Sequence, residues 1–108
     1  MTGRATFMLA PPRLMIYSAP MKPWYLYILE CADGTLYTGI TTDPGRRLAE
    51  HNAGVGARYT RARLPVTMVY QTSVKDRSEA SRLEYRIKKL PRKTKLEMIR
   101  AEKTGHRS

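Results

Sequence analysis

The segment from Tyr25 to His51 restricts the fold most, because it joins two short strand-like runs by a tight turn and then starts a helix. Residues 25–31 (YLYILEC) are rich in aromatic and β-branched side chains and are too short for a typical helix. Residues 35–40 (TLYTGI) follow an Ala-Asp-Gly sequence that is typical of a turn. We therefore predict an antiparallel hairpin as the organising element of the chain.

The length of the hairpin loop decides which face of the sheet each tyrosine occupies. With a three-residue loop and Gly34 in the left-handed conformation, Tyr37 lies opposite Leu29, so Tyr27 and Tyr37 point to the same face. A two-residue loop puts them on opposite faces, since one step of register turns every side chain over. Both loops are compatible with the sequence.

A helix is predicted directly after the hairpin. Asp43 is a suitable N-cap and Pro44 suits the first helical position. The helix should end near Asn52, because Asn52 and Gly54 are stop signals.

Two pairs of side chains lie four residues apart on this helix. Arg47 and His51 share one face. Arg46 and Glu50 form a second pair, which we interpret as a surface ion pair of small energetic value.

Residues 53–64 (AGVGARYTRARL) combine two glycines with three arginines and Tyr59. Such a loop can wrap a phosphate backbone and offer one aromatic ring for stacking. A mobile solvated linker explains the same composition equally well. Residues 66–72, started by Pro65, are predicted to form a third strand.

The clearest helical pattern covers residues 78–90 (SEASRLEYRIKKL). Its apolar stripe consists of Ala80, Leu83, Ile87 and Leu90, and Glu84 falls beside that stripe. Spacing alone favours a surface glutamate paired with Lys88. Pro91 should end this helix, and residues 94–97 (TKLE) resemble a capping box that opens a last helix to about Lys103.

The charge of the chain points to a polyanionic partner. Twenty Lys and Arg against nine Asp and Glu give a net charge of +11, and 17 of the 20 basic residues lie from Arg46 onward. Nucleic acid is the first candidate and an anionic membrane surface the second. A surface tuned only for solubility would mix the two signs more evenly.

Length and cysteine content set the remaining limits. A chain of 108 residues with 42% apolar content can bury one core. Cys31 is the single cysteine, which excludes an internal disulfide and a thiolate metal cluster and fits a reducing cytoplasm. We expect a disordered leader at residues 1–22, with Met21 as an alternative start, one domain at 23–103 and a flexible tail at 104–108. The apolar runs of the leader are too short to span a bilayer.

These motifs together resemble the GIY-YIG nuclease domain, and in particular the small stand-alone proteins of the UPF0213 group. The resemblance covers roughly residues 24–100. Tyr25-Leu26-Tyr27 stands where that family has GIY, and Tyr37-Thr38-Gly39 stands where it has YIG. The remaining matches are Arg47 for the family arginine, His51 for the His or Tyr one turn later, and Glu84 for the metal-binding glutamate. The last match reverses the preference that spacing alone gives for Glu84.

The resemblance implies an α/β (α+β) sandwich, with a three-stranded antiparallel sheet flanked by helices. It also implies a hydrolase that cuts phosphodiester bonds with one divalent ion, Mg²⁺ or Mn²⁺. Glu84 would hold the metal through oxygen ligation, and the fork-shaped Arg47 would stabilise the transition state. As general base for the attacking water we favour Tyr37, if the metal or Arg47 stabilises its phenolate. His51 is the second choice because its ordinary pKa near 6.5 suits the task, and Tyr27 would orient the water or hydrogen-bond the base.

Two positions depart from the family pattern. Tyr25 replaces the first glycine of GIY, and Arg92-Lys93-Thr94-Lys95 follows Pro91 where several members place an asparagine. We expect no additional targeting domain, so the basic surface would select the substrate with weak sequence preference. The side chains expected to contact nucleic acid are Arg46, Arg58, Tyr59, Arg61, Arg63 and Lys88.

The sequence thus predicts a cytoplasmic, metal-dependent endonuclease, with DNA favoured over RNA and a role in DNA repair or processing. Its rival is a small basic nucleic-acid-binding module without catalytic activity. A subunit whose basic face docks an acidic protein is a further alternative. The preferred nucleic-acid structure and the oligomeric state are left open by the sequence.

Overall fold

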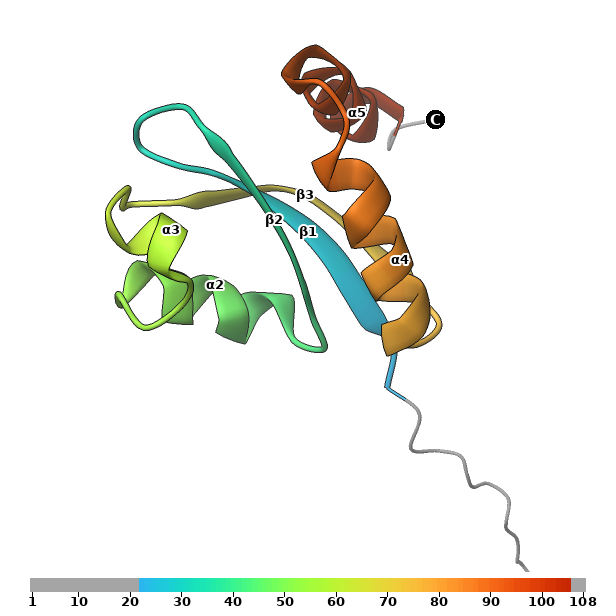
Figure 1. The fold of residues 1–108 in the computed structure, drawn as a ribbon, viewed down its shortest axis with the longest axis horizontal. Coiled ribbons are helices and arrows are strands. Elements are labelled where there is room, and N and C mark those ends of the chain that lie inside the picture. Colours follow the sequence, from blue (N-terminus) through green and yellow to red (C-terminus); the bar gives the residue numbers. More distant parts are fainter. Residues whose placement is uncertain (1–21, 106–108) are drawn as a thin grey trace, which may run out of the picture.

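A computed structural model describes residues 22–105 of the chain, and the expected leader at residues 1–21 and the last three residues lie outside them. The described part is an α+β sandwich with helices on both faces of a three-stranded antiparallel sheet (Figure 1), as predicted. Its elements in chain order are β1 (Trp24–Glu30), β2 (Leu36–Thr41), α2 (Pro44–Asn52), α3 (Arg58–Arg61), β3 (Thr67–Val74), α4 (Arg77–Lys88) and α5 (Arg92–Gly105). The strand order is β2-β1-β3, so β2 is an edge strand.

The β1–β2 hairpin has a three-residue loop, the one of the two predicted loops that places Tyr27 and Tyr37 on the same face. Gly34 adopts a φ of +85°, a left-handed conformation that glycine tolerates without steric cost. The Cys31 amide donates to the Thr35 carbonyl at 2.8 Å, and Leu29 lies opposite Tyr37 in the register. Tyr27 and Tyr37 therefore share one face of the sheet.

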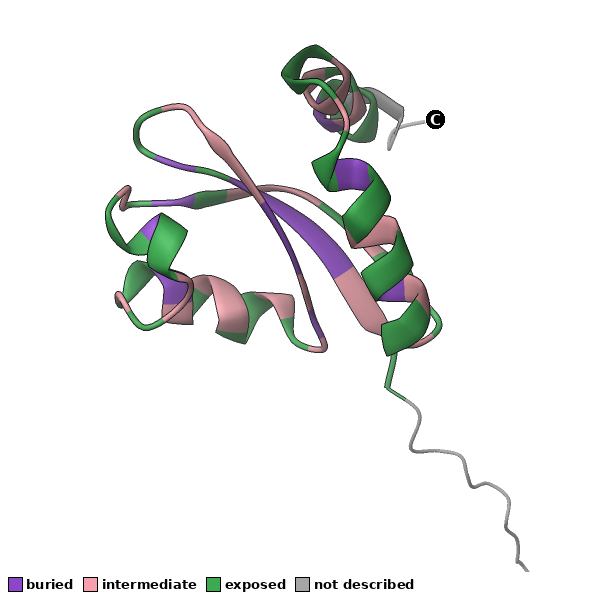
Figure 2. Cartoon of the chain, viewed as in Figure 1, coloured by how far each residue is buried: buried purple, intermediate pink, exposed green. Residues whose placement is uncertain are grey.

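The central strand β1 divides the core into two layers (Figure 2). On one face, Leu26 and Ile28 pack with Ile87 of α4 and Ile99 of α5. On the other face, Tyr27 and every second residue after it in the chain pack on the side of the sheet where α2 lies. The buried members of this cluster are Tyr27, Leu29, Cys31 and Val66, and the partly buried ones are Tyr37, Leu48, Leu64 and Met68. This alternation follows from the two-residue period of a strand.

Helix α2 begins and ends as predicted. The Asp43 side chain accepts a hydrogen bond from the Arg46 amide at 3.1 Å, and Pro44 occupies the first turn. At the other end, the Asn52 side-chain amide exchanges two hydrogen bonds with the Val66 backbone, at 3.0 and 2.8 Å. Asn52 is therefore both a stop signal and the link between α2 and the start of β3.

Three boundaries differ from the sequence-based prediction. The loop expected at residues 53–64 contains the short helix α3. Asp76 caps α4, whose backbone begins at Arg77 and ends at Lys88, two residues before the predicted end. The predicted capping box at residues 94–97 is wrong, because the Lys95 amide already donates to the Pro91 carbonyl at 3.1 Å and α5 starts at Arg92.

Helix α5 also continues to Gly105, two residues beyond its predicted end, so the first two residues of the expected tail are helical. None of the helices within residues 22–105 is both long and apolar enough to span a membrane.

Candidate active site

A buried line of three side chains connects β1, α2 and α3. The Tyr27 hydroxyl lies 3.0 Å from His51 Nε2, and His51 Nδ1 lies 2.7 Å from Thr60 Oγ1. All three residues are almost inaccessible, at 1%, 0% and 0% exposure. Such burial is tolerated because each polar atom in the line has a hydrogen-bond partner.

The hydrogen bonds of the Thr60 hydroxyl determine which nitrogen of His51 carries the proton. Thr60 Oγ1 donates its single hydrogen to the Ala57 carbonyl at 3.0 Å, so it must accept from His51 Nδ1. His51 Nε2 is then unprotonated and accepts from the Tyr27 hydroxyl. His51 is therefore a neutral imidazole whose two nitrogens are both engaged.

Two glycines provide the space for this line. A Cβ at Gly39 would lie 2.5 Å from the Tyr27 hydroxyl oxygen, and a Cβ at Gly56 would lie 2.5 Å from His51 Nδ1. Real Cβ atoms do not approach other atoms so closely, so both positions require glycine. The glycine at the end of Tyr37-Thr38-Gly39 is thus explained by the hydroxyl of the tyrosine on the neighbouring strand.

Arg47 extends from α2 and is held in place by its own helix. Its Nη1 donates to Glu50 Oε1 at 2.9 Å, while Glu50 Oε2 accepts from Arg46 at 2.7 Å. The Arg47 guanidinium also lies near the Tyr27 hydroxyl, where it opposes the rise in the pKa of that phenol. The predicted Arg46–Glu50 surface pair exists, but the same carboxylate also orients Arg47.

Burial shifts the acid–base behaviour of the pair formed by Tyr27 and His51. Desolvation raises the pKa of Tyr27, although the nearby Arg47 opposes this shift. Desolvation and the nearby Arg47 charge lower the pKa of His51. Both shifts favour the neutral forms, in agreement with a Tyr27 that donates to a neutral His51.

Tyr37 lies at the open end of the same cluster. Its ring packs edge-on against His51 at 5.4 Å between centroids and is stacked on Tyr59 at 5.9 Å. The Arg63 guanidinium lies over the Tyr59 ring at 3.8 Å and is itself held by Asp33 at 3.1 Å. The Tyr59 ring is therefore in contact with both an aromatic ring and a guanidinium.

Glu84 approaches this cluster from the helix on the opposite face of the sheet. Helix α4 contacts the edge strand β2, and the nearby Glu84 carboxylate contributes to the raised pKa of Tyr27, after burial and Tyr37. Glu84 is also ion-paired with Lys88 at 3.1 Å, the pair that its helical spacing indicates. Among the described residues no ion pair or hydrogen bond joins Glu84 to Arg47.

Four of the five predicted catalytic residues, Tyr27, Tyr37, Arg47 and His51, meet on one face of the sheet, and Glu84 extends from α4, which contacts the edge strand from the other face (Figure 1). Tyr27 and His51 are linked directly, Arg47 lies near Tyr27, Tyr37 contacts His51, and Glu84 is near enough to act on Tyr27 electrostatically. Within residues 22–105 no three His, Cys, Asp or Glu side chains gather around a common point. The nearby carboxylates are Glu50, which is hydrogen-bonded to Arg47, and Glu84, which is paired with Lys88.

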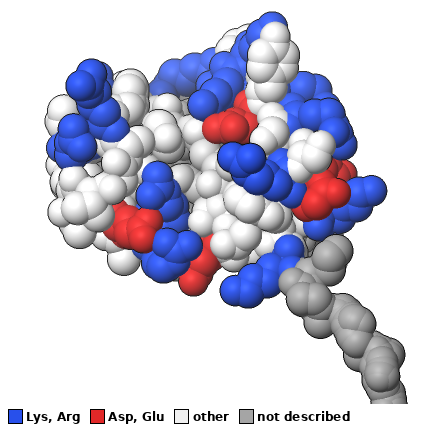
Figure 3. Space-filling model, turned by 60° about the horizontal axis from the view of Figure 1, so that its bottom comes forward, with Lys and Arg blue, Asp and Glu red and all other residues white. Residues whose placement is uncertain are grey.

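Of the six residues predicted to contact nucleic acid, Tyr59 is described above and the five basic ones fall into two groups. Arg46, Arg63 and Lys88 are each paired with a carboxylate. Arg58 and Arg61 on α3 are exposed and make no ion pair within the described part of the chain. Figure 3 shows Lys and Arg side chains on both sides of a largely uncharged area, with a few acidic groups among them.

Two residues of the cluster were not predicted as site residues. The role of Glu50 was detectable, since its spacing of three from Arg47 places the two side chains on one helical face. The role of Thr60 could not be detected in the sequence. It depends on α3, which places Thr60 against His51 although the two residues are nine positions apart.

Comparisons with known proteins show the family of the chain. The model of the GIY-YIG catalytic domain matches residues 23–97. The chain therefore belongs to the GIY-YIG family.

Within this family it is similar to the UPF0213 proteins. One from Desulfotalea psychrophila, DP2720, is 54% identical over 83 residues, which are 76% of each chain. Another from Halobacterium salinarum, VNG_2274C, is 59% identical over 71 residues, or 66% of this chain and 92% of the relative. The solution structure of protein EF2693 from E. faecalis is 46% identical with a TM-score of 0.52, and the match covers 81% of this chain and 90% of that one.

Proposed function

We propose that the protein is a metal-dependent endonuclease that hydrolyses phosphodiester bonds of nucleic acid, with DNA favoured over RNA. The observation that carries this proposal is the cluster of Tyr27, Tyr37, Arg47 and His51 on one face of the sheet, with Glu84 on the helix that contacts the edge strand from the other face. Membership of a nuclease family and a net charge of +11 support a nucleic-acid substrate. A role in DNA processing or repair, and a cytoplasmic location, are part of the same proposal.

The residues present fit one hard divalent cation, Mg²⁺ or Mn²⁺. Mg²⁺ is bound in phosphate-processing sites by one or two carboxylates and otherwise by water and phosphate oxygens. Glu84 supplies one such carboxylate, so the lack of a larger acidic cluster in residues 22–105 agrees with this type of ion. When bound, the metal would neutralise negative charge on the phosphate and the leaving oxygen.

Arg47 is assigned to charge stabilisation. Its guanidinium keeps its positive charge because Glu50 and Tyr27 both raise its pKa. The side chain is 31% exposed, so it remains open to a phosphate on its solvent side. Glu50 fixes its direction from within the same helix turn.

Tyr37 is proposed as the general base and His51 as a supporting residue. Both nitrogens of His51 are engaged, and the ring has no exposed surface from which to reach water. The Tyr37 side chain is half-buried at the mouth of the cluster and lines an open hollow. A general base must lie within hydrogen-bond reach of the proton it removes, which favours Tyr37 over His51.

The ion pair between Glu84 and Lys88 favours one rival, a basic nucleic-acid-binding module without activity. The two proposals differ in their metal dependence. Purified protein is incubated with single-stranded, double-stranded and branched DNA and with RNA, each with Mg²⁺, with Mn²⁺ or with a chelator. A nuclease cuts at least one substrate only when metal is present, whereas the binding module binds these substrates and cuts none.

A further inference from the structure

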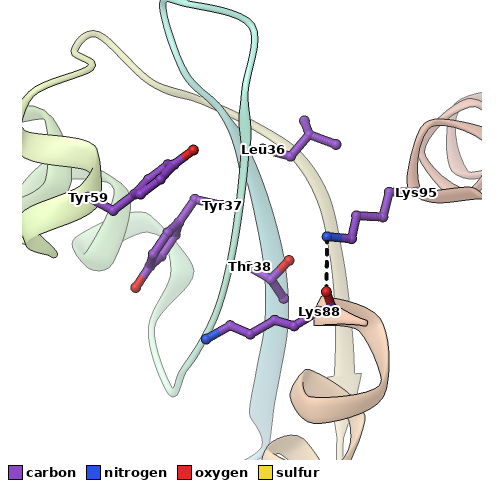
Figure 4. A pocket seen from close by; sticks show the side chains of 6 residues that line it. All are labelled: Leu36, Tyr37, Thr38, Tyr59, Lys88 and Lys95. Carbon is purple, nitrogen blue, oxygen red and sulfur yellow. Dashed lines mark hydrogen bonds between the residues drawn. The ribbon is translucent and has the colours of Figure 1, made fainter. Parts of the chain in front are cut away.

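A hollow lies beside the catalytic cluster, on the outer edge of β2. It has a volume of about 270 Å³ and is lined by Leu36, Tyr37 and Thr38 of β2, Tyr59 of α3, Lys88 of α4 and Lys95 of α5. Figure 4 shows the tyrosines on one side of β2 and Lys95 on the other, while the Lys88 side chain extends across the strand towards Tyr37. The hollow therefore brings together side chains from both faces of the sheet.

A second hollow continues the first along the same strand. It has a volume of about 180 Å³, is lined by Thr35, Leu36, Arg92 and Lys95, and shares Leu36 and Lys95 with its neighbour. We name the two together the β2-edge groove. From Thr35 to Thr38 the groove follows about 10 Å of strand.

The lining of the β2-edge groove is cationic. Its charged side chains are Lys88, Arg92 and Lys95, and no acidic residue lines either hollow. Arg92 Nη1 donates to the Gly34 carbonyl at 2.8 Å, and Lys95 Nζ lies 3.5 Å from the Lys88 carbonyl. Neither Arg92 nor Lys95 forms an ion pair with a described carboxylate, so both charges are available to an anion.

The aromatic wall offers a base only part of its surface for stacking. The Tyr59 ring is stacked with Tyr37 and also contacts the Arg63 guanidinium, so part of its aromatic surface is already occupied. Stacking on a nucleobase requires an open aromatic face. The groove is therefore better adapted to phosphates than to bases.

We propose that the β2-edge groove binds the sugar–phosphate backbone next to the bond that is cut. This inference rests on the proposed function, because Tyr37 belongs both to the groove and to the catalytic cluster. Lys95 and Arg92 are assigned as phosphate contacts, and Lys88 joins them at the end nearest Glu84. Recognition through phosphates predicts affinity with little sequence preference and a strong dependence on salt.

The test compares Lys95→Met with Lys93→Met, two variants that each remove one charge from α5. Two residues correspond to about 200° around a helix, so the two side chains lie on different sides of α5. Lys93 is exposed and does not line the groove. Binding of a labelled oligonucleotide of mixed sequence, single-stranded and duplex, is measured by fluorescence anisotropy in a chelator over a range of KCl concentrations.

We expect Lys95→Met to weaken binding several-fold and to reduce the slope of log K against log salt by about 0.7 to 0.9, the effect of one lost phosphate contact. Lys93→Met should leave the slope unchanged. Equal slopes for the two variants would overturn the proposal. Both variants are first checked by circular dichroism and urea unfolding.

NMR titrations identify the ligand and separate this proposal from the catalytic one. The oligonucleotide should shift the amides of residues 35–38 in wild type and much less in Lys95→Met. Shifts of equal size with inorganic phosphate alone would show an adventitious ion only and overturn the proposal.

The groove proposal and the nuclease proposal can fail separately. If wild type cuts no substrate but only Lys95→Met reduces the slope of log K against log salt, the groove is supported and the nuclease proposal fails. If Glu84→Gln abolishes cleavage while the two lysine variants bind alike, the groove proposal fails and the nuclease proposal stands.

Discussion

Replacement of Thr60 by valine tests the buried hydrogen-bond line that orients Tyr27. Valine has nearly the shape of threonine but lacks the hydroxyl, which contacts His51 Nδ1 at 2.7 Å and the Ala57 carbonyl at 3.0 Å. Both His51 and Thr60 are fully buried, so water cannot replace the lost partner without rearrangement. In the variant, His51 can keep its proton on Nδ1, which then has no hydrogen-bond acceptor. Alternatively, His51 adopts the other tautomer, in which a protonated Nε2 faces the Tyr27 hydroxyl.

The size of the effect follows from the two lost hydrogen bonds. An unsatisfied buried donor costs about 1 to 3 kcal/mol, and the lost bond to Ala57 adds about 1 kcal/mol. We therefore expect Thr60→Val to lower the free energy of unfolding by about 2 to 4 kcal/mol. In a domain of this size a loss of 2 kcal/mol lowers Tm by about 8 to 16 °C.

Urea unfolding and long-range ¹H–¹⁵N NMR of the imidazoles are the two assays. The matched control is Thr60→Ser, which retains the hydroxyl and should retain the tautomer of wild type. Wild-type His51 should carry its proton on Nδ1. A proton on Nε2 in wild type, or equal stability of wild type and Thr60→Val, would refute the reasoning.

Three further predictions concern the same cluster. Gly39→Ala should lower the free energy of unfolding by about 1 to 3 kcal/mol in urea titrations, because its Cβ would overlap the Tyr27 hydroxyl; unchanged stability would show that the ring moves aside freely. Burial lowers the pKa of His51, so the unfolded chain binds a proton on this imidazole at higher pH than the folded chain does. The contribution of His51 to the free energy of unfolding is therefore complete above about pH 6.5 and falls below it by at most about 1.4 kcal/mol per pH unit. His51→Gln should remove this contribution from the pH dependence of unfolding, and an identical pH profile would argue against it. Glu50→Gln should slow cleavage without weakening oligonucleotide binding, since Arg47 loses its charged partner; a cleavage rate equal to wild type would exclude a positioning role.

The strand and helix order was predictable because local signals and tertiary structure agree. The Ala-Asp-Gly turn, the Asp43 cap and the continuous aromatic and apolar run of β1 all favour the observed elements. The loop length of the hairpin could not be chosen from sequence, because both registers bury the same kinds of side chain. The tertiary packing of Tyr27 and Tyr37 around His51 selects one of them.

The capping box was misplaced for a local reason. Thr94 in the apparent capping box lies inside α5, because a proline directly before the helix already provides a suitable start. Tyr59 is stacked with Tyr37 and its ring also contacts Arg63, and such contacts between separate segments leave no trace in the local sequence. Its predicted contact with nucleic acid stays a prediction.

The position of Glu84 was predictable only through the family resemblance. Its helical spacing indicates an ion pair with Lys88, and that pair is present. The proximity of its carboxylate to Tyr27 depends on how α4 lies along the β2 edge, which spacing along one helix does not describe. The structure thus contains both interactions at once.

The central claim is tested most directly by the single-turnover cleavage rate of Glu84→Gln with Mg²⁺ or Mn²⁺. The control is Glu97→Gln, which removes one exposed carboxylate from α5. Loss of a metal ligand removes several kcal/mol of transition-state stabilisation, so the rate should fall about 100-fold or more while oligonucleotide binding is retained. Glu97→Gln should cut like wild type. A Glu84→Gln variant that cuts as fast as wild type, or a wild-type protein that cuts no nucleic acid with either metal, would contradict the account.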